Sequence, residues 1–179
     1  VTHRRRFGRP VVSSRIGRAF ATYLYRKLGS NNLTVSIGRD VRISSPRIQN
    51  AFIAGVLNSG VSVIDIGMVP TPVVYYSIPC YGVNGAVAVT ASHLAREFNG
   101  IKLMVGLLNT SQEELQQILR IAQQGDFIYG TGQYEKRNIV PLYIEYIKGK
   151  IIHGLERFRI VVDAGNGTTG YIAAKIFRG

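Results

Sequence analysis

A serine and a histidine stand side by side at Ser92-His93, and Lys102 follows further along the chain. A serine hydroxyl is a poor nucleophile until a neighbouring group takes its proton, and histidine and lysine can both do so. Between them, Asn99-Gly100 is a turn signal that would bring Lys102 back towards Ser92. Adjacent side chains of an extended chain point in opposite directions, so His93 can either orient the loop or act as the base. The spacing alone fits a nucleophile loop or a plain polar connection.

The segments on either side of this stretch would place it at the edge of a sheet. The run GAVAVT (85–90) is continuously apolar, as in a strand buried on both faces, and IKLMV (101–105) is a second strand. Helical and strand patterns alternate along the chain, which is typical of βαβ units. We therefore expect an α/β fold, a three-layer α/β/α sandwich with a mostly parallel (mixed) sheet. Ser92 would lie just past the carboxyl end of a strand, where open α/β sheets bind ligands.

Apolar spacing and capping residues predict the other elements. Ser45 is a candidate N-cap before Pro46, Ser111 begins a capping box with Glu114, and Gly125 is a helix stop. Buried positions are expected at Leu115, Ile118, Leu119 and Ala122 in the helix before Gly125, and at Leu142, Ile144, Tyr146 and Ile147 in a helix over 140–152. Further strands are expected at 33–38, 61–67 and 157–164, further helices at 15–28, 46–58 and 72–79, and a polar connection at 126–138.

A domain boundary is expected where the alternating pattern gives way to a single helix. Residues 1–135 would form the first α/β domain, and residues 136–156 would form a linker helix. Residues 157–179 would then be the first strand and helix of a second α/β domain, of which this chain holds only the start.

The glycines that open this last helix have a second interpretation. Gly165, Gly167 and Gly170 match the G-x-G-x-x-G pattern of dinucleotide-binding domains, after a predicted strand and before a helix. Asp163 stands just before them, where its charge would repel a pyrophosphate. We therefore favour a tight turn that opens the second domain, and a nucleotide-binding domain is the alternative.

Composition narrows the class of protein. No apolar run reaches the roughly 18–20 residues that span a bilayer, so no membrane partner is expected. Cys80 is the only cysteine, which excludes an internal disulfide and favours a reducing cytoplasm. The net charge is +12, with six arginines among the first 18 residues, and such a charge can mark a nucleic-acid surface. Because no aromatic-interleaved basic ladder or known binding module accompanies it, we expect small anionic substrates and no nucleic acid.

Taken together and in order, the motifs resemble those of the α-D-phosphohexomutases, the phosphomannomutase and phosphoglucomutase family. Thr90-Ala91-Ser92-His93 followed by Asn99-Gly100-Ile101-Lys102 is similar to that family's active-site serine loop, T-A-S-H-N-P-x-x-x-N-G-x-K. Three more segments are similar to family motifs: Gly38-Arg39-Asp40 with Arg42 and Ser44-Ser45 to G-R-D-x-R-x-S-S, Val69-Pro70-Thr71-Pro72 to a P-T-P turn, and VVDAGNGTTG to the start of the second domain. The resemblance covers nearly all of residues 15–179.

The resemblance implies a mechanism centred on Ser92. The serine would carry a phosphoryl group, donate it to a hexose monophosphate and take back the phosphate from the other end of the bisphosphate intermediate. In the family, Mg²⁺ binds this phosphoserine together with three aspartates of a D-x-D-x-D-R loop. Lys102 corresponds to the lysine that contacts the reacting groups, and His93 to the loop histidine.

The resemblance also implies supporting roles around the loop. Thr90, Asn99 and Gly100 would shape it. The residues Arg39, Asp40 and Arg42 would support it from the neighbouring strand end, and an ordinary surface ion-pair cluster is the alternative for that trio.

This chain departs from the family pattern at the serine loop and at the metal ligands, among other places. Leu94-Ala95 stands where the family has Asn-Pro, and no D-x-D-x-D-R loop occurs anywhere in the sequence. The aspartate ligands of Mg²⁺ and the sugar-binding domains would therefore lie outside this chain, which we expect to be unable to complete the mutase cycle alone. A non-catalytic sugar-phosphate-binding or assembly module remains an alternative. The sequence does not distinguish mannose, glucose and glucosamine phosphates, because the residues that select the sugar belong to the absent domains.

Overall fold

Runs of β-branched and small apolar residues form the central sheet of the protein. The structure is a computed structural model and describes residues 10–150 and 159–178. Six strands make one sheet in the order β5-β4-β3-β1-β2-β6. Their bounds are Thr34–Arg39 (β1), Ser62–Met68 (β2), Gly85–Val89 (β3), Ile101–Val105 (β4), Leu108–Asn109 (β5) and Tyr134–Lys136 (β6). β1, β2, β3 and β6 are parallel, and β4 and β5 each pair antiparallel with the preceding strand. The predicted mostly parallel, mixed sheet is confirmed.

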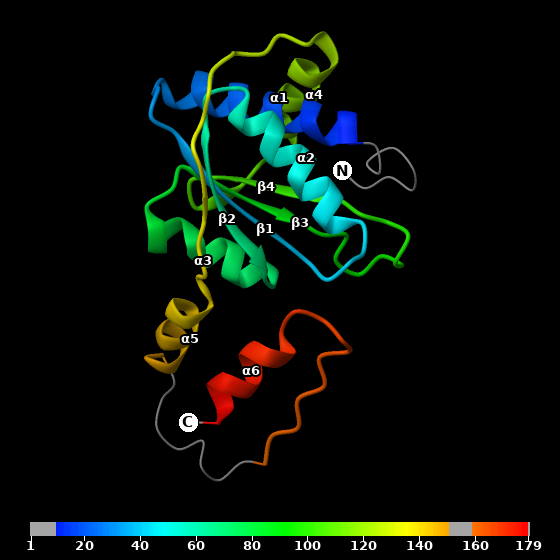
Figure 1. The fold of residues 1–179 in the computed structure, drawn as a ribbon, viewed down its shortest axis with the longest axis vertical. Coiled ribbons are helices and arrows are strands. Elements are labelled where there is room, and N and C mark those ends of the chain that lie inside the picture. The colour runs from blue at the N-terminus through cyan, green and yellow to red at the C-terminus, as the bar shows by residue number, and fades with distance from the viewer. Residues whose placement is uncertain (1–9, 151–158, 179) are drawn as a thin grey trace.

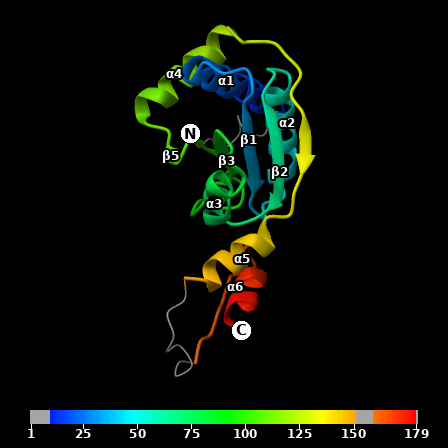
Figure 2. The same ribbon diagram turned by 90° about the vertical axis from the view of Figure 1, so that its left-hand side faces the viewer.

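Helices cover both faces of this sheet (Figures 1 and 2). α1 (Pro10–Leu28) and α2 (Ser45–Leu57) cover one face, and α4 (Gln112–Gln124) packs against α1. α3 (Thr71–Tyr81) covers the other face, and α5 (Val140–Lys148) and α6 (Gly170–Phe177) extend beyond its end. The expected three-layer α/β/α sandwich is therefore confirmed. No helix in the described ranges is both long and apolar enough to cross a membrane.

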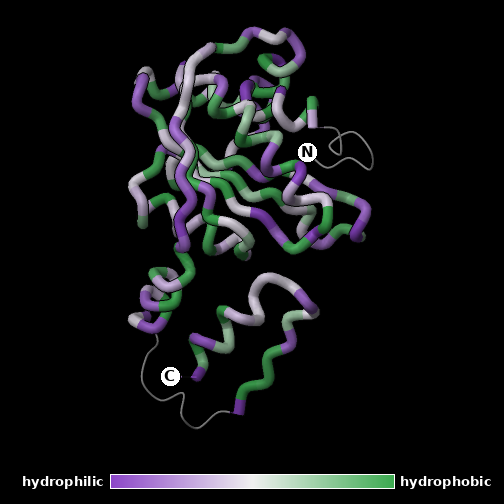
Figure 3. Tube along the Cα trace, viewed as in Figure 1, coloured by the Kyte–Doolittle hydropathy of each residue, from purple (hydrophilic) through white to green (hydrophobic). Residues whose placement is uncertain are grey.

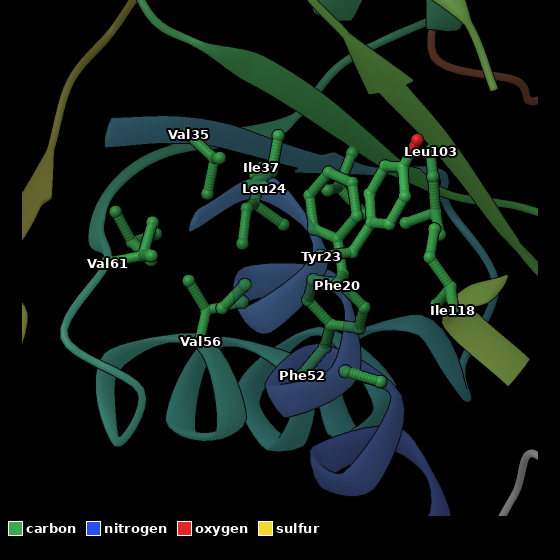
Figure 4. Close-up of a cluster of buried hydrophobic side chains, with 14 of the residues drawn as sticks. Phe20, Tyr23, Leu24, Val35, Ile37, Phe52, Val56, Val61, Leu103 and Ile118 are labelled. Carbon is green, nitrogen blue, oxygen red and sulfur yellow. The ribbon is translucent and has the colours of Figure 1, made fainter. Parts of the chain in front are cut away.

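The larger core lies between the sheet and the pair α1 and α2 (Figure 4). Phe20 and Leu24 of α1, Phe52 and Val56 of α2, and Ile37 of β1 are all fully buried in it. The Phe20 and Phe52 rings lie 6.2 Å apart between centroids. Burying an apolar side chain of this size contributes about 1.5–3 kcal/mol, so this core holds both helices firmly on the sheet.

Two glycines allow α1 and α2 to meet backbone to backbone. A Cβ atom at Gly17 would lie 2.3 Å from the carbonyl oxygen of Phe52, and one at Gly55 would lie 2.0 Å from that of Ser14. Both distances are far shorter than van der Waals contact, so neither position accepts a side chain at this separation. The placement of α2 beside the end of β1 therefore depends on these glycines.

The smaller core, on the opposite face, joins α3 to α5. The Tyr76 ring of α3 contacts Tyr143 and Tyr146 of α5, with centroids 5.4 Å and 4.7 Å away. The Tyr76 hydroxyl also donates a hydrogen bond to the Leu142 carbonyl at 3.3 Å. The helix predicted as a linker thus packs on the first domain, and the division of the chain at residues 135 and 156 stays a prediction.

Most expected elements are found, with small shifts at their ends. α1 begins at Pro10 rather than at residue 15, and Gly29 follows it with a φ of +61°. α2 begins at Ser45, so its N-cap is Ser44 and not Ser45 as predicted. The Ser45 hydroxyl donates to the Asp40 carboxylate at 2.5 Å, and the helix begins one residue before Pro46.

Three predictions of buried positions are wrong. Leu119 of α4 is 42% exposed, and Ile121 takes its place in the core. Leu142 and Tyr146 of α5 are also exposed, at 43% and 46%, whereas Tyr143 and Ile144 are partly buried against the smaller core.

The polar connection predicted over 126–138 contains a strand. β6 pairs in parallel with β2, and the Tyr134 hydroxyl donates to the buried Asp65 carboxylate at 2.9 Å. Figure 2 shows β6 as the edge strand beside β2. Three residues with exposed side chains carry no apolar pattern, so this strand depends on pairing that the sequence does not display.

The strand predicted over 157–164 is not found in its described residues, 159–164, and the start of a second domain at 157–179 stays a prediction. Residues 159–164 form no strand, although they are largely apolar in Figure 3. A strand needs a hydrogen-bonded neighbour, and none of the described residues pairs with this segment, where Val161 is 95% exposed. The predicted helix after it is confirmed as α6. Residues 151–158, which include the predicted end of the linker helix, lie outside the described ranges.

We expect Gly55→Ala to lower the free energy of unfolding by about 1–3 kcal/mol, because the new methyl group meets the Ser14 carbonyl and forces α1 and α2 apart. Urea unfolding followed by circular dichroism measures this change. Ala54→Ser, on the exposed side of the same helix turn, is the matched control. Equal stability of Gly55→Ala and the wild type would contradict the close contact.

The predicted capping box at the start of α4 is confirmed, and it also connects α4 to α1. The Ser111 hydroxyl accepts from the Glu114 amide, and the Glu114 carboxylate accepts from the Ser111 amide. The same carboxylate accepts from the Tyr23 hydroxyl at 2.7 Å and pairs with Lys27. Lys27, the Ser111 amide and Tyr23 lower the pKa of the Glu114 carboxyl to about 2.

This lowered pKa predicts a specific pH dependence. The pKa of Glu114 in the folded protein lies below its ordinary value of 4.5. The ionised carboxylate therefore stabilises the fold fully above pH 4.5, and this stabilisation is lost as the pH falls towards 2. We expect Glu114→Gln to cost about 1–2 kcal/mol at pH 7 and much less at pH 2.5, by urea titration at both values. Glu145→Gln, at an exposed position of α5, is the control. An equal loss at both pH values would refute this role of Glu114.

Candidate functional site

The serine-containing loop joins β3 to β4 at the carboxyl end of β3. The Thr90 amide donates to the Gly100 carbonyl at 3.0 Å and closes the base of the loop. The Asp40 amide, just past the end of β1, donates to the Val89 carbonyl at 3.0 Å. The ends of the central parallel strands β1 and β3 therefore meet here, at the edge where α/β sheets bind ligands. In Figure 1 the loop is the green segment that projects beyond β3.

Ser92 has an unusual backbone conformation within this loop. Its φ is +54°, in the left-handed region that non-glycine residues seldom adopt. Its amide donates to the Thr90 hydroxyl at 3.0 Å, and its side chain is exposed. Such a conformation costs of order 1–3 kcal/mol and persists only where surrounding contacts hold it. The loop thus presents the Ser92 hydroxyl to solvent on a backbone that the neighbouring residues keep in place.

Asn99 anchors the returning end of the loop. Its side chain is only 4% exposed, and its amide donates to the hydroxyls of Ser44 and Ser45 at 2.8 and 2.9 Å. Its carbonyl oxygen accepts from the Gly100 amide at 2.8 Å. These bonds fix the loop to the start of α2. The two serines belong to the segment that resembles a family motif, but the sequence alone does not show that they bind Asn99.

Asp40 and Arg42 form a mostly buried ion pair below the loop. Arg42 Nε lies 3.0 Å from Asp40 Oδ2, and the two side chains are 13% and 18% exposed. Asp40 also accepts from the Arg42 amide at 3.0 Å. Arg42 in turn donates to carbonyl groups of the loop, the nearest being that of Leu94 at 2.7 Å. A pair so little exposed, with one member bonded to another segment, differs from an ordinary surface ion pair.

The remaining predicted residues are less closely engaged. Arg39 is the last residue of β1, and its guanidinium donates to the Asp40 carbonyl at 3.2 Å. Lys102 lies on β4 opposite Ala88 and is half-buried. His93 is exposed. Within the described ranges, neither His93 nor Lys102 forms a hydrogen bond with Ser92.

The glycine-rich segment before α6 is a turn that uses its own amides. The Gly165 amide donates to the Asp163 carboxylate at 2.8 Å, and the Gly167 amide donates to the Ala164 carbonyl at 2.7 Å. Gly165 and Asn166 both have positive φ values, as tight turns require. Amides engaged in this way are not available to a pyrophosphate, and no strand precedes them in the described part. These observations favour the turn over the nucleotide-binding alternative.

No group of three His, Cys, Asp or Glu side chains that could hold a metal ion occurs in residues 10–150 and 159–178. The Asp40 carboxylate, next to the loop, already accepts from Arg42 and Ser45. The side chains of this part of the chain therefore do not form a metal site by themselves.

The fold and the loop define the class: an α/β/α domain with an exposed serine at the carboxyl edge of its sheet. Residues 3–129 match the family model described as phosphoglucomutase/phosphomannomutase, alpha/beta/alpha domain I. The chain belongs to this family.

Similar proteins extend the match along the chain. The phosphomannomutase/phosphoglucomutase of Pseudomonas aeruginosa PAO1 is 33% identical over 173 residues, 94% of this chain. A probable phosphoglucosamine mutase of Pyrococcus abyssi is 37% identical over 175 residues. A crystal structure of a phosphoglucomutase/phosphomannomutase family protein from Burkholderia thailandensis superimposes with a TM-score of 0.86 at 34% identity, over 95% of this chain and 38% of its own. This chain spans 37% of the length of both curated relatives.

Asn99→Ala tests the anchor of the loop. We expect a loss of about 1–3 kcal/mol in the free energy of unfolding, because the Ser44 and Ser45 hydroxyls and the Gly100 amide lose a buried partner. Hydrogen exchange should also become faster in peptides that cover residues 90–100 and stay unchanged in α4. Asn109→Ala, at an exposed strand end, is the control. Unchanged exchange in the loop would show that Asn99 does not anchor it.

Proposed function

We propose that this chain provides the phosphoserine domain of a phosphohexomutase, an intramolecular phosphotransferase of the isomerase class. The whole protein would interconvert hexose 6-phosphate and hexose 1-phosphate. The observation that carries the proposal is the exposed Ser92 in a left-handed conformation, on a loop anchored at the carboxyl edge of the sheet in a member of this family. The names of the similar proteins support a hexose phosphate as the substrate.

The proposed reaction moves one phosphoryl group at a time. A hydroxyl of the hexose monophosphate attacks the phosphorus of phospho-Ser92, and the bond from phosphorus to Ser92 Oγ breaks. The proton of the sugar hydroxyl passes through a base to the departing Ser92 Oγ. The bisphosphate formed then turns end over end. Ser92 Oγ attacks its other phosphoryl group, and the serine proton passes to the departing sugar oxygen. The phosphate count on the enzyme is restored, and the product is the isomeric monophosphate.

Within this chain His93 and Lys102 are the proposed assisting residues. Lys102 would offset the charge of the transferring phosphoryl group, because phosphoryl transfer depends more on charge neutralisation than on covalent help. The exposed His93 would accept or donate the proton. The roles of Thr90, Asn99, Gly100, Arg39, Asp40 and Arg42 would be to support the loop.

Mg²⁺ belongs to the proposal only through Ser92. A hard cation prefers oxygen ligands, and the phosphoryl oxygens on Ser92 would supply them. Since the side chains of residues 10–150 and 159–178 do not form a metal site, the further ligands would come from residues other than these. The single cysteine supports the proposed cytoplasmic location, and the expected absence of nucleic-acid and membrane partners stays a prediction.

A second candidate is a sugar-phosphate-binding or assembly module that does not turn over. Leu94-Ala95 favours it, since these residues replace the Asn-Pro of the resembling motif beside Ser92. A coupled assay on the full-length gene product with glucose 1-phosphate or mannose 1-phosphate, Mg²⁺ and a trace of hexose bisphosphate separates the two. Turnover supports the mutase, and binding without turnover supports the module.

Ser92 is predicted to carry one phosphate in the full-length gene product. Intact-mass analysis should find a species heavier by one phosphoryl group, and Ser92→Ala should remove it and lower the mutase rate by at least about a thousandfold. Ser111→Ala, at the N-cap of α4, is the control and should keep the phosphate. A phosphate that persists in Ser92→Ala, or a wild type that turns over without one, would rule out Ser92 as the carrier.

A further inference from the structure

The guanidinium of Arg42 contacts the serine loop at four carbonyl groups. Nη2 donates to the carbonyls of Ser92 at 3.1 Å and Leu94 at 2.7 Å. Nη1 donates to those of Ala95 at 2.8 Å and Phe98 at 3.3 Å. One side chain from the end of β1 therefore reaches across the whole loop.

Every donor of this guanidinium is engaged. An arginine side chain has five N–H donors in a planar fork. In Arg42, Nε donates to Asp40, and the two terminal nitrogens donate to the four carbonyl groups of the loop. The Asp40 carboxylate also fixes the backbone of Arg42 and accepts from Ser45, so the fork itself has no freedom to move. Asp40 therefore orients the guanidinium of Arg42 through contacts that do not involve the loop.

The loop has few other attachments near the serine. For residues 92–95, all hydrogen bonds to side chains or backbone outside the loop come from Arg42 in the described part of the chain. The bonds of the Ser92 and Leu94 amides are local, to Thr90 and Ala91. Arg42 therefore holds the Ser92 carbonyl from outside the loop, in addition to the local bonds around this left-handed residue.

The Arg42 side chain binds the backbone carbonyl groups of the loop and not the side chains of the loop. Leu94 and Ala95 are bound by their carbonyl oxygens, which every residue type has, and both side chains are exposed. The loop can thus keep its shape with Leu94-Ala95 in place of Asn-Pro. Asp40, at 3.0 Å, balances the charge of Arg42, so Arg42 acts on the loop by fixing its shape and not by its charge.

We propose that Arg42 is the positioning residue for phosphoryl transfer at Ser92. By binding four carbonyls of the loop, it sets the direction in which Ser92 presents its oxygen to the sugar phosphate. The kinetic part of this inference rests on the proposed function, whereas the structural part does not. Small displacements of a reacting atom, of about 1 Å, can lower a rate by about a hundredfold, so the loss of this clamp should affect the chemical step.

Arg42→Lys in the full-length gene product tests the inference, because lysine keeps the charge and loses the planar fork. We expect kcat with glucose 1-phosphate or mannose 1-phosphate to fall at least about tenfold while KM changes less than about twofold. Hydrogen exchange in residues 90–100 should rise at least about tenfold, with α4 unchanged. Arg120→Lys, on the exposed face of α4, is the matched control. Wild-type kcat and exchange in Arg42→Lys would overturn the proposal.

A second variant keeps the test valid if Arg42→Lys does not fold. Leu94→Asn with Ala95→Pro restores the residues of the resembling motif and keeps both carbonyl acceptors, and no described hydrogen bond uses the Ala95 amide. We expect a kcat within about threefold of the wild type. A kcat tenfold or more above that of the wild type would show that the side chains at positions 94 and 95, and not Arg42, determine how the loop positions Ser92. Such a result would overturn the proposal. If the wild type neither turns over nor carries phosphate, the proposed function fails, and hydrogen exchange still decides whether Arg42 holds the loop.

Discussion

The Asp40 carboxylate is the constraint on which the candidate site depends. It lies where β1 ends, and it binds the amide and guanidinium of Arg42 as well as the Ser45 hydroxyl. Arg42 then binds the serine loop, and Ser45 binds Asn99 at the other end of the same loop. A single, mostly buried acceptor therefore connects β1, the start of α2 and both arms of the loop. Removing it would leave several polar groups without a partner in a largely buried place.

The fold explains why this junction is stable. β1 lies between β2 and β3 in the middle of the sheet, so its carboxyl end is held on both sides. α2 packs against α1 at backbone distance through Gly17 and Gly55, and this contact fixes where Ser44 and Ser45 stand. The apolar core thus supplies the rigidity, and a small polar network uses it to place one serine. Catalytic groups on loops need such a rigid support.

Much of the fold could be predicted from the sequence, and much of the site's geometry could not. The buried strand 85–90, the capping box at Ser111 and the helix stop at Gly125 are local patterns, and the structure confirms them. β6 is missed because its pairing with β2 joins distant residues that show no apolar pattern. The prediction of a strand over 157–164 is wrong for residues 159–164, which the structure describes. The alternation of helical and strand patterns and the apolar character of this segment do not say whether a partner strand is present. The bonds of Arg42 to residues 92–98 span 50 to 56 positions, so only the folded chain shows them.

The central claim is that Ser92 carries the phosphoryl group that the sugar receives. Phosphorus-31 NMR of the full-length gene product tests it most directly, because it follows the phosphorus atom itself. We expect one phosphoserine resonance in the resting protein, which diminishes as hexose monophosphate is added while resonances of a hexose bisphosphate appear. A resting protein without that resonance, or one whose phosphoserine signal stays constant during turnover, would contradict the account.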